Sequence, residues 1–330
     1  MIVARRYSPA DKPAWDRFVF ESREGTFLFQ RDFMDYHQDR FTDASLICFS
    51  GKRCVGILPA SAHKEARSIK SHGGLTYGTL LTLPDASAEL VRQMWVAIAT
   101  TYRSEGFERI EIKPTPHIYH RIPAEETLYW LFRASATLSA RTLSATIDLQ
   151  QAVSFTTLRR RMRNKALRNN LSLQHDNREG WQMFWPILEE ALLRHNTSPV
   201  HRITEMEQLA TLFPKNISLH TVHKEGNCIG GCVLFHTPQT IHVQYIATNS
   251  CGRQYGALDL LFAHLIEQFS AQYHASSQTC PRYFDFGIST ERGGQVLNHG
   301  LMHQKEGFGG RAICYDTYLV ELSQLEVLSL

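Results

Sequence analysis

Apolar residues recur along the chain with two spacings, one typical of helices and one of strands. From Ser87 to Glu105 they recur every three or four positions, which predicts a helix with one buried face that ends at Gly106. Two short apolar runs on either side of Gly51 predict a hairpin. The same reasoning predicts further helices over 11–22, 31–37, 125–134, from about 153, and over 180–194, 204–212, 254–269 and 295–306, and strands over 2–7, 45–49, 54–59, 67–71, 109–113, 142–149, 171–175, 217–222, 228–235, 240–247, 283–286 and 312–322.

The two halves of this α/β pattern repeat each other at a fixed offset. Cys54-Val55-Gly56 recurs as Cys228-Ile229-Gly230, and 228 − 54 = 174. Gly252 lies 174 residues after Gly78, and the run 284–286 lies 174 residues after the run 110–112. A repeat this long is a whole domain. We therefore predict two copies of one unit, residues 1–150 and 151–330, with a cleft between them as the expected ligand site.

Composition narrows the class of protein. The 330 residues are 43% hydrophobic and 20% charged with a net charge of +3, which is ordinary for a globular protein and too weak a basic excess to indicate a nucleic-acid binder. The seven cysteines form no CxxC pair, and no histidine or cysteine group has metal-ligand spacing. No apolar run is long enough to span a membrane. We expect a cytoplasmic protein with reduced thiols and no metal, and of unknown oligomeric state.

A glycine-containing segment, 249–256, lies between the strand over 240–247 and a long helix. Such a segment directs backbone N–H groups and the positive end of the helix toward an anion such as phosphate. Gly256 would allow close approach of the backbone, and Arg253 would add a charge-assisted contact. The alternative is that these glycines only make the turn.

Two stretches carry a resemblance to a known family. One is Tyr283-Phe284-Asp285-Phe286-Gly287-Ile288-Ser289-Thr290-Glu291, continued by Leu297-Asn298-His299-Gly300-Leu301 and Lys305-Glu306-Gly307-Phe308-Gly309, and the other is Ser71-His72-Gly73-Gly74-Leu75-Thr76-Tyr77-Gly78. These two stretches, together with the order of strands and helices in each half, resemble the GNAT N-acyltransferases. The tandem arrangement of the two halves resembles the FemAB-like or BioF2-like branch of that superfamily. The resemblance covers nearly the whole chain. It implies two tandem GNAT-like domains, each a mixed, mostly antiparallel sheet flanked by helices.

The resemblance implies that an amine directly attacks an activated acyl group. The donor would be acyl-CoA as a co-substrate, with no permanently bound cofactor, or aminoacyl-tRNA, because Arg253-Gln254-Tyr255-Gly256-Ala257-Leu258 departs from the family's pyrophosphate loop by ending in Leu258. The donor would lie beside a splayed fourth strand, here residues 242–246. The donor-binding candidates are Ile246, Ala247, Gly252, Arg253, Gln254, Tyr255, Gly256 and Asn298.

A base must take the amine proton, and four residues are candidates for the proton transfers. Asp285 lies in an apolar strand, where a carboxylate is either functional or held by a structural partner. Glu291 lies in a predicted loop, where it is either the base or a solvated acid. His242 and Tyr245 are predicted on opposite faces of their strand by alternation, so only one of them faces a given cleft. Tyr245 would protonate the leaving group or simply pack.

The acceptor site is predicted from basic and polar residues. The run 159–168 has six positive charges in ten positions, which indicates an anion such as a diphosphate-linked acceptor or tRNA backbone, unless acids elsewhere pair with it. The loop 71–78 takes the register of the pyrophosphate loop but has no Arg or Lys, so the first unit is predicted to have lost donor binding and to shape the acceptor site. The acceptor candidates are Gln30, Arg31, His72, Tyr77, Arg159, Arg163, Ser289 and Lys305.

Three functions therefore remain open. The first is an N-acyltransferase that moves an acyl group from acyl-CoA to an amine of a polar metabolite, such as a nucleotide-linked amino sugar or a cell-envelope precursor. The second is a FemAB-like aminoacyl transferase that uses aminoacyl-tRNA. The third is a non-catalytic GNAT-like protein that binds a ligand in the same cleft.

Overall fold

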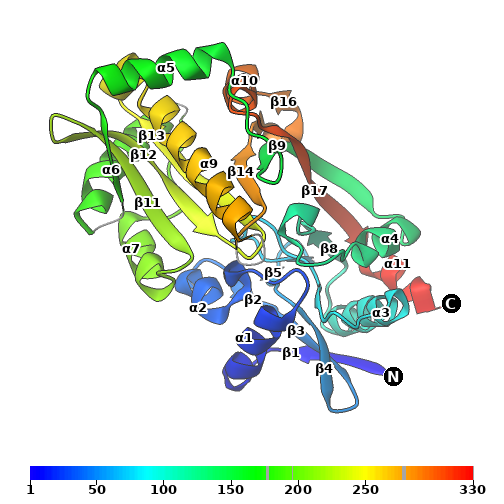
Figure 1. The fold of residues 1–330 in the computed structure, drawn as a ribbon. Coiled ribbons are helices and arrows are strands. Elements are labelled where there is room, and N and C mark those ends of the chain that lie inside the picture. Colours follow the sequence, from blue (N-terminus) through cyan, green and yellow to red (C-terminus); the bar gives the residue numbers. More distant parts are fainter. Residues whose placement is uncertain (176–177, 195, 277–279, 330) are drawn as a thin grey trace. The chain divides into compact units, whose positions relative to one another are not determined.

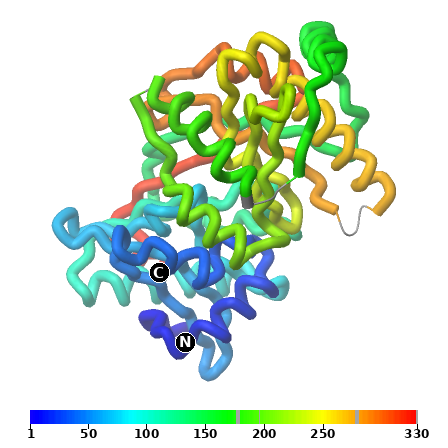
Figure 2. Tube along the Cα trace, turned by 90° about the vertical axis from the view of Figure 1, so that its left-hand side faces the viewer, coloured from blue at the N-terminus to red at the C-terminus, as the bar shows by residue number. Residues whose placement is uncertain are grey.

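The computed structural model describes residues 1–175, 178–194, 196–276 and 280–329. The chain forms two compact units, which Figures 1 and 2 show in two views. Unit 1 is Met1–Thr142, Arg292–Gln295 and Cys314–Leu330, and unit 2 is Leu143–Glu291 and Val296–Ile313. Two strands, β9 (Thr137–Asp148) and β17 (Arg311–Glu321), contribute residues to both units. Each unit is thus assembled from segments distant in the sequence, whereas the predicted domains met at one boundary near residue 150.

Unit 1 has a four-stranded antiparallel sheet in the order β1-β3-β4-β7 and a second group of short strands around β8. The predicted helix stripe is buried in α3, where Met94, Trp95 and Ile98 are fully covered, and the Ser87 hydroxyl caps its start by accepting from the Leu90 N–H. The strands are β1 (Ile2–Arg6), β2 (Thr42–Asp43), β3 (Leu46–Ser50), β4 (Arg53–Leu58), β5 (Ser61–His63), β6 (Ser68–Lys70), β7 (Leu81–Thr82) and β8 (Arg109–Ile112), and the helices are α1 (Lys12–Glu21), α2 (Arg31–Met34), α3 (Ala88–Ser104), α4 (Glu126–Arg133) and α11 (Leu322–Glu326).

Unit 2 has a sheet in the order β10-β11-β12-β13-β14-β9, in which only β13 and β14 are parallel neighbours. Helix α9 packs on one face of this sheet and α6 on the other (Figure 1). The strands are β10 (Ser172–His175), β11 (Ile217–Lys224), β12 (Asn227–His236), β13 (Thr240–Thr248), β14 (Tyr283–Ile288), β15 (Thr290–Glu291) and β16 (Val296–Leu297), and the helices are α5 (Thr157–Arg168), α6 (Arg178–Leu193), α7 (Ile203–Leu212), α8 (Ser250–Tyr255), α9 (Ala257–Ala275) and α10 (His299–Gly307).

The predicted duplication is present in the structure. Strands β4 and β12 begin at residues 53 and 227, β8 and β14 at 109 and 283, and β9 and β17 at 137 and 311, so the offset is 174 in each pair. A β-bulge recurs with them, since the register of β3 on β4 shifts between Cys48 and Phe49 and that of β11 on β12 between Val222 and His223. A bulge is a local feature of the ladder, and its recurrence at one register supports two copies of one unit.

One predicted equivalence is wrong. In unit 2, β13 is one strand that pairs with both β12 and β14, whereas in unit 1 β6 makes the parallel pair and β7 pairs with β4. Residues 71–80 loop out between β6 and β7, so the offset falls to 166 where Thr82 and Thr248 make equivalent pairs. The loop 71–78 therefore does not take the place of the pyrophosphate loop, and Gly78 is not the counterpart of Gly252. The segment 83–87 leads into the long helix of unit 1.

Histidines of differing exposure gather at the β10–β11–β12 edge of unit 2, where His220 is buried. The Ser218 hydroxyl bonds Nε2 of both His220 and His236, and the ring of His175 lies 4.5 Å from that of His220. Burial, with a smaller contribution from neighbouring histidines, lowers the pKa of His220 to about 3 and that of His236 to about 4. In the described part of the chain, no three potential ligand side chains gather as a metal site.

Within the described ranges, no helix is both long and apolar enough to cross a bilayer.

These histidines predict acid sensitivity. In the unfolded chain these histidines have an ordinary pKa of about 6.5, whereas in the folded protein they stay neutral to lower pH. As the pH falls from 6.5 to 4, the unfolded chain therefore binds more protons than the folded protein, and the free energy of unfolding should fall. The expected slope is about 1 kcal/mol per pH unit for each such histidine. Urea unfolding between pH 4.5 and 7.5 measures it. His220→Asn should flatten the slope and His299→Asn, at an exposed position, should not; equal slopes in both variants would contradict the assignment.

Candidate active site

The parallel strands β13 and β14 part at one point in unit 2. They pair over only three positions, and the last is His242 opposite Asp285. Beyond it, β13 bulges against β12, and β14 shifts its register on β9 between Asp285 and Ile288. Gly287 takes φ +74° in this shift, and a Cβ there would lie 3.3 Å from Cε1 of His242. The splayed fourth strand that the sequence implies therefore opens directly after the His242–Asp285 pair.

Asp285 is fully buried and hydrogen-bonded on both oxygens. Oδ2 lies 2.7 Å from Nδ1 of His242, and Oδ1 accepts from the hydroxyls of Ser144 (2.5 Å) and Thr146 (2.7 Å). Burial alone would raise the pKa of this carboxyl, but the hydrogen bond and charge of His242 and the two hydroxyls outweigh it and hold the pKa at about 2. Asp285 is thus placed to orient His242, and a group so acidic and enclosed is a poor acceptor for an amine proton.

The ring of His242 is held at its Nδ1 end by Asp285. Because Nδ1 lies against Asp285, the neutral ring carries its proton there and leaves a lone pair on Nε2. Its side chain is 12% exposed, in contrast to the fully buried carboxylate. A carboxylate bonded to Nδ1 of an imidazole is an arrangement that general bases use in many unrelated enzymes.

Lys305 secures the distorted part of β14. Its ammonium donates to the carbonyl oxygens of Gly287 (2.7 Å) and Ile288 (2.8 Å), and burial lowers its pKa to about 8 against the opposing charge of Asp285. Ser289 is also buried, and its Oγ has no hydrogen-bond partner among the described residues. These two predicted acceptor residues therefore lie beside the distorted part of β14.

Two further predicted residues meet at the start of α10. Asn298 caps this helix, since its Oδ1 accepts from the Leu301 N–H, and its Nδ2 donates to Glu291 at 3.3 Å. Glu291 is exposed. Neither residue touches His242 or Asp285 in any described contact, so their donor and base roles stay predictions.

Tyr245 and His242 lie on the same face of β13, contrary to the prediction from strict alternation. Val233 pairs with Tyr245 and Leu234 with Val243, so Gln244 is an extra residue that shifts the alternation by one. Val243 and Ile246 accordingly both pack in the core with α9. The opposite face carries His242 and Tyr245.

His201 is a partner of Tyr245 that the sequence did not indicate. The Tyr245 hydroxyl lies 2.6 Å from Nδ1 of His201 and accepts from its backbone N–H at 3.2 Å. Burial raises the pKa of Tyr245 to about 12, so the phenol keeps its proton. His201 lies between α6 and α7, where neither periodicity nor a motif distinguishes it from a packing residue.

The segment predicted to hold a diphosphate is folded into α8 and packed. The Asn249 side chain accepts from the Gly252 N–H, Arg253 donates to the Thr248 carbonyl, and the Gln254 carbonyl accepts from Lys165 of α5. Gly256, at φ +78°, ends α8 and starts α9, so the predicted helix over 254–269 starts later than expected. The remaining predicted donor residues are also packed, Ile246 and Tyr255 beside the unit 2 core and Ala247 at 4% exposure.

Helix α5 covers the start of α9. A Cβ on Gly256 would lie 2.8 Å from the Met162 carbonyl oxygen, and Ala257 is fully buried. Asp259, in the first turn of α9, pairs with Arg159 at 2.7 Å. Its pKa is raised to about 6, because burial outweighs the charge of Arg159. The positive end of α9 thus has the protein's own carboxylate beside it rather than an open cradle for phosphate.

Arg159 and Arg163 face α9. They pair with acidic residues there, which is the alternative to anion binding that the sequence left open. Arg163 binds Glu267 at 2.7 Å, and Arg159 binds Asp259. Both predicted acceptor contacts are thus engaged in ion pairs within unit 2.

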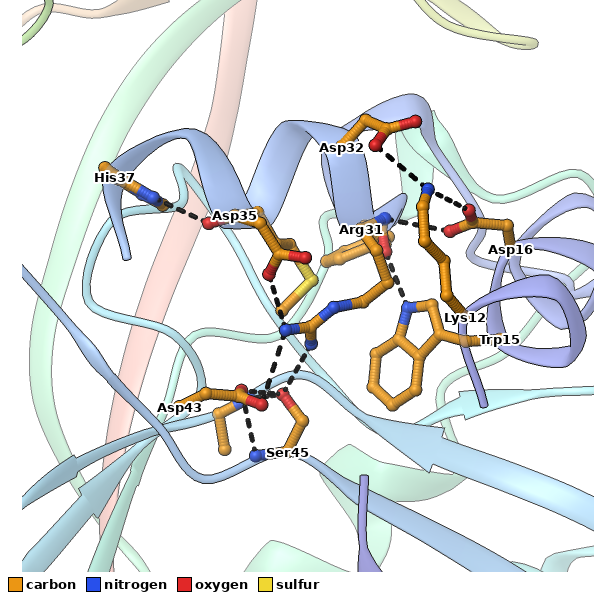
Figure 3. Close-up of polar contacts among 12 residues, drawn as sticks. Lys12, Trp15, Asp16, Arg31, Asp32, Asp35, His37, Asp43 and Ser45 are labelled. Atoms are coloured by element: carbon orange, nitrogen blue, oxygen red, sulfur yellow. Dashed lines mark hydrogen bonds and ion pairs between the residues drawn. The ribbon is translucent and has the colours of Figure 1, made fainter. Parts of the chain in front are cut away.

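The candidates of unit 1 lie in its interior. Figure 3 shows the Arg31 guanidinium directed at Asp35, Asp43 and Ser45, and it also stacks 3.9 Å above the Tyr7 ring. Gln30 starts α2, where its carbonyl accepts from the N–H groups of residues 33 and 34. Arg31 is 3% exposed and thus serves at least the packing of its own unit.

His72 and Tyr77 lie in the loop between β6 and β7. His72 takes φ +56°, stacks 5.2 Å from His37, and has its pKa lowered to about 3, chiefly by burial. Tyr77 is 2% exposed, and its hydroxyl donates to the Thr26 hydroxyl at 3.4 Å. An acceptor role for these residues stays a prediction.

Unit 1 carries a different pair where unit 2 has His242 and Asp285. The parallel strands β6 and β8 end their pairing at Lys70 opposite Glu111, and Glu111 is the counterpart of Asp285 at the repeat offset (285 − 111 = 174). These side chains make an ion pair at 3.6 Å and both are partly exposed. A lysine ammonium has no lone pair, so Lys70 could not take a proton as an imidazole can.

Comparison with known proteins agrees with this architecture. Residues 154–292 match the sequence model of a family described as Acetyltransferase (GNAT) domain. The structure of FemX aligns over 98% of this chain and 99% of its own, with a TM-score of 0.66 and 11% identity. The chain has a tandem GNAT fold of the FemAB-like kind. A tandem GNAT protein from the clavulanic acid biosynthesis pathway aligns over 98% of both chains (TM-score 0.52, 13% identity).

The structure of L-PGS from Bacillus licheniformis aligns over 98% of this chain and 96% of its own, with a TM-score of 0.59 and 12% identity. No curated protein matches the chain in sequence. The predicted fold is confirmed, and the residues that match the GNAT-domain model, 154–292, include His242 and Asp285.

The cover of α5 over α9 predicts a stability difference between two glycines. Gly256→Ala and Gly226→Ala both place a side chain at φ near +80°, but only the first meets a neighbour, the Met162 carbonyl. We expect about 1 kcal/mol of destabilisation for Gly226→Ala and about 1–3 kcal/mol more for Gly256→Ala. Equilibrium urea unfolding measures both. Equal losses would mean that α5 does not lie on the start of α9.

Proposed function

We propose that unit 2 forms an amide bond, with His242 as the base that takes a proton from the acceptor amine. The observation that carries this proposal is the pair of His242 and a buried, ionised Asp285 at the point where β13 and β14 part. In GNAT-like folds this splay is the place for the acyl donor, so the base would lie beside the reacting carbonyl. Holding both reactants there removes much of the entropic cost of their meeting.

The reaction would then proceed by direct attack. The amine nitrogen bonds to the donor carbonyl carbon while Nε2 of His242 takes an amine proton, and Asp285 stabilises the resulting imidazolium. Backbone N–H groups of β13 beyond the last paired position would stabilise the oxyanion. The intermediate collapses by breaking the bond to the leaving oxygen or sulfur, and the imidazolium returns the proton to that atom.

We infer that the donor is an aminoacyl-tRNA rather than an acyl-CoA. A GNAT-type CoA site needs an accessible helix start for the diphosphate, and here Gly256 and Ala257 are buried under α5 with Asp259 beside them. An aminoacyl ester has no diphosphate at that place. The acceptor would be an amine of a polar metabolite, such as a nucleotide-linked amino sugar or a cell-envelope precursor, bound by unit 1 in the cytoplasm.

A donor screen with active-site variants tests this proposal. Labelled aminoacyl-tRNAs, or labelled acetyl-CoA, are incubated with the protein and a panel of amino-sugar nucleotides and cell-envelope precursors, and amide products are detected by mass spectrometry. We expect product from aminoacyl-tRNA. His242→Gln and Asp285→Asn should lower kcat by about 10²–10⁴-fold with little change in KM, because a general base contributes about that factor. Glu291→Gln, which removes an exposed acid, is the control and should stay within about threefold.

Each other outcome is informative. Product from acetyl-CoA alone would overturn the donor assignment but keep the base. Full turnover by His242→Gln would overturn the base. Binding of a panel member without any transfer would favour the non-catalytic alternative.

A further inference from the structure

Helix α5 has an inner and an outer face with different chemistry. The inner face is held to α9 through the ion pairs of Arg159 and Arg163, the buried Ala166 and the contact of Met162 with Gly256. The outer face carries the exposed Arg161 and Arg168, and the exposed Arg160 lies about a quarter turn away at the edge of this face. In Figure 2, α5 is the bright green coil seen nearly end-on at the edge of unit 2.

The three exposed arginines contribute no ion pair to the described part of the fold. Arg160 donates only to the Thr157 hydroxyl of its own helix, and among the described residues no carboxylate lies within ion-pair distance of any of the three. At 100° and 1.5 Å per residue, Arg161 and Arg168 lie within about 20° of each other and about 10 Å apart along the helix. An unneutralised row of guanidinium groups is the form of cation that binds phosphates in a bidentate manner.

We propose that this outer face of α5 binds the phosphate backbone of an RNA duplex, namely the acceptor stem of the tRNA donor, an inference that rests on the proposed function. The face is rigid, because the inner face is fixed by two ion pairs and close packing. It is carried by the same helix that covers the start of α9. Helix α5, which covers the place where a CoA diphosphate would bind, would thus bind the phosphates of the tRNA donor on its outer face.

A bilayer surface fits this face less well. Leu158 and Leu167 are 45% and 50% exposed, but each lies about a quarter turn from the row of Arg161 and Arg168, on opposite flanks. A helix that lies on a membrane turns one continuous apolar face inward and keeps its cations at the sides. Here Arg161 and Arg168 are outermost and the leucines are at the sides, with Arg160 beside Leu167, which is the reverse order.

Anisotropy of a fluorescein-labelled RNA hairpin, with a twelve-base-pair stem and a single-stranded ACCA end, tests the assignment. The full-length protein is titrated at several KCl concentrations. Arg160→Gln, Arg161→Gln and Arg168→Gln combined should weaken binding at least tenfold at moderate salt and reduce the slope of log K against log [KCl] by about 2 to 3, one for each phosphate that is no longer bound. The matched control combines Arg17→Gln, Arg109→Gln and Arg133→Gln, three exposed residues of unit 1, and should change affinity less than about twofold.

Failure of the proposal is distinct from failure of the proposed function. No RNA binding by the wild type, or equal losses in both triple variants, would overturn the role of α5. Vesicles of phosphatidylcholine and phosphatidylglycerol, mixed two to one, test a membrane as the partner. If the wild type binds these vesicles, and the α5 triple variant loses vesicle binding but keeps RNA binding, the face binds a membrane instead of RNA. His242→Gln should bind the hairpin like the wild type. RNA binding by a wild type that transfers nothing would sink the proposed function and leave this surface standing.

Discussion

The hydrogen bond between His242 and Asp285 is the interaction on which the rest of the site depends. It joins the last paired position of two parallel strands that separate directly afterwards. Burying a carboxylate is costly unless its charge is paired and its lone pairs are bonded. Here Ser144 and Thr146 of β9 and the imidazole of β13 meet that requirement together, so three strands fix the position of one carboxylate.

That requirement also explains the distorted backbone beside the pair. Gly287 is needed both because of its positive φ and because a side chain would approach the His242 ring. Lys305 then donates to the carbonyl oxygens of Gly287 and Ile288 at this distortion. The duplicated unit holds Lys70 and Glu111 at the same position, so one architecture carries a histidine–carboxylate pair in one copy and a lysine–carboxylate ion pair in the other.

The sequence was sufficient for the longer helices and strands and for the duplication, because periodicity, glycine placement and a constant offset between the halves are local or repeated signals. It did not predict the short strands β2, β5, β7, β15 and β16. It also brought His242 and Asp285 forward as candidates, and the structure pairs them. It failed where one residue changes the geometry: the extra Gln244 in β13 moves Tyr245 to the face of His242. It also could not distinguish Arg159 from Arg160, since only the packing of α5 on α9 decides which arginine meets Asp259. Long-range contacts of this kind leave no spacing pattern in the chain.

The protonation of the His242 ring tests the central claim most directly. Long-range ¹⁵N–¹H correlation spectra of histidine-labelled protein, assigned with His242→Gln, report which ring nitrogen carries the proton when the ring is neutral. The account predicts a proton on Nδ1 and a bare Nε2, and a change of that signal in Asp285→Asn. A neutral ring with its proton on Nε2, unaffected by Asp285→Asn, would contradict it.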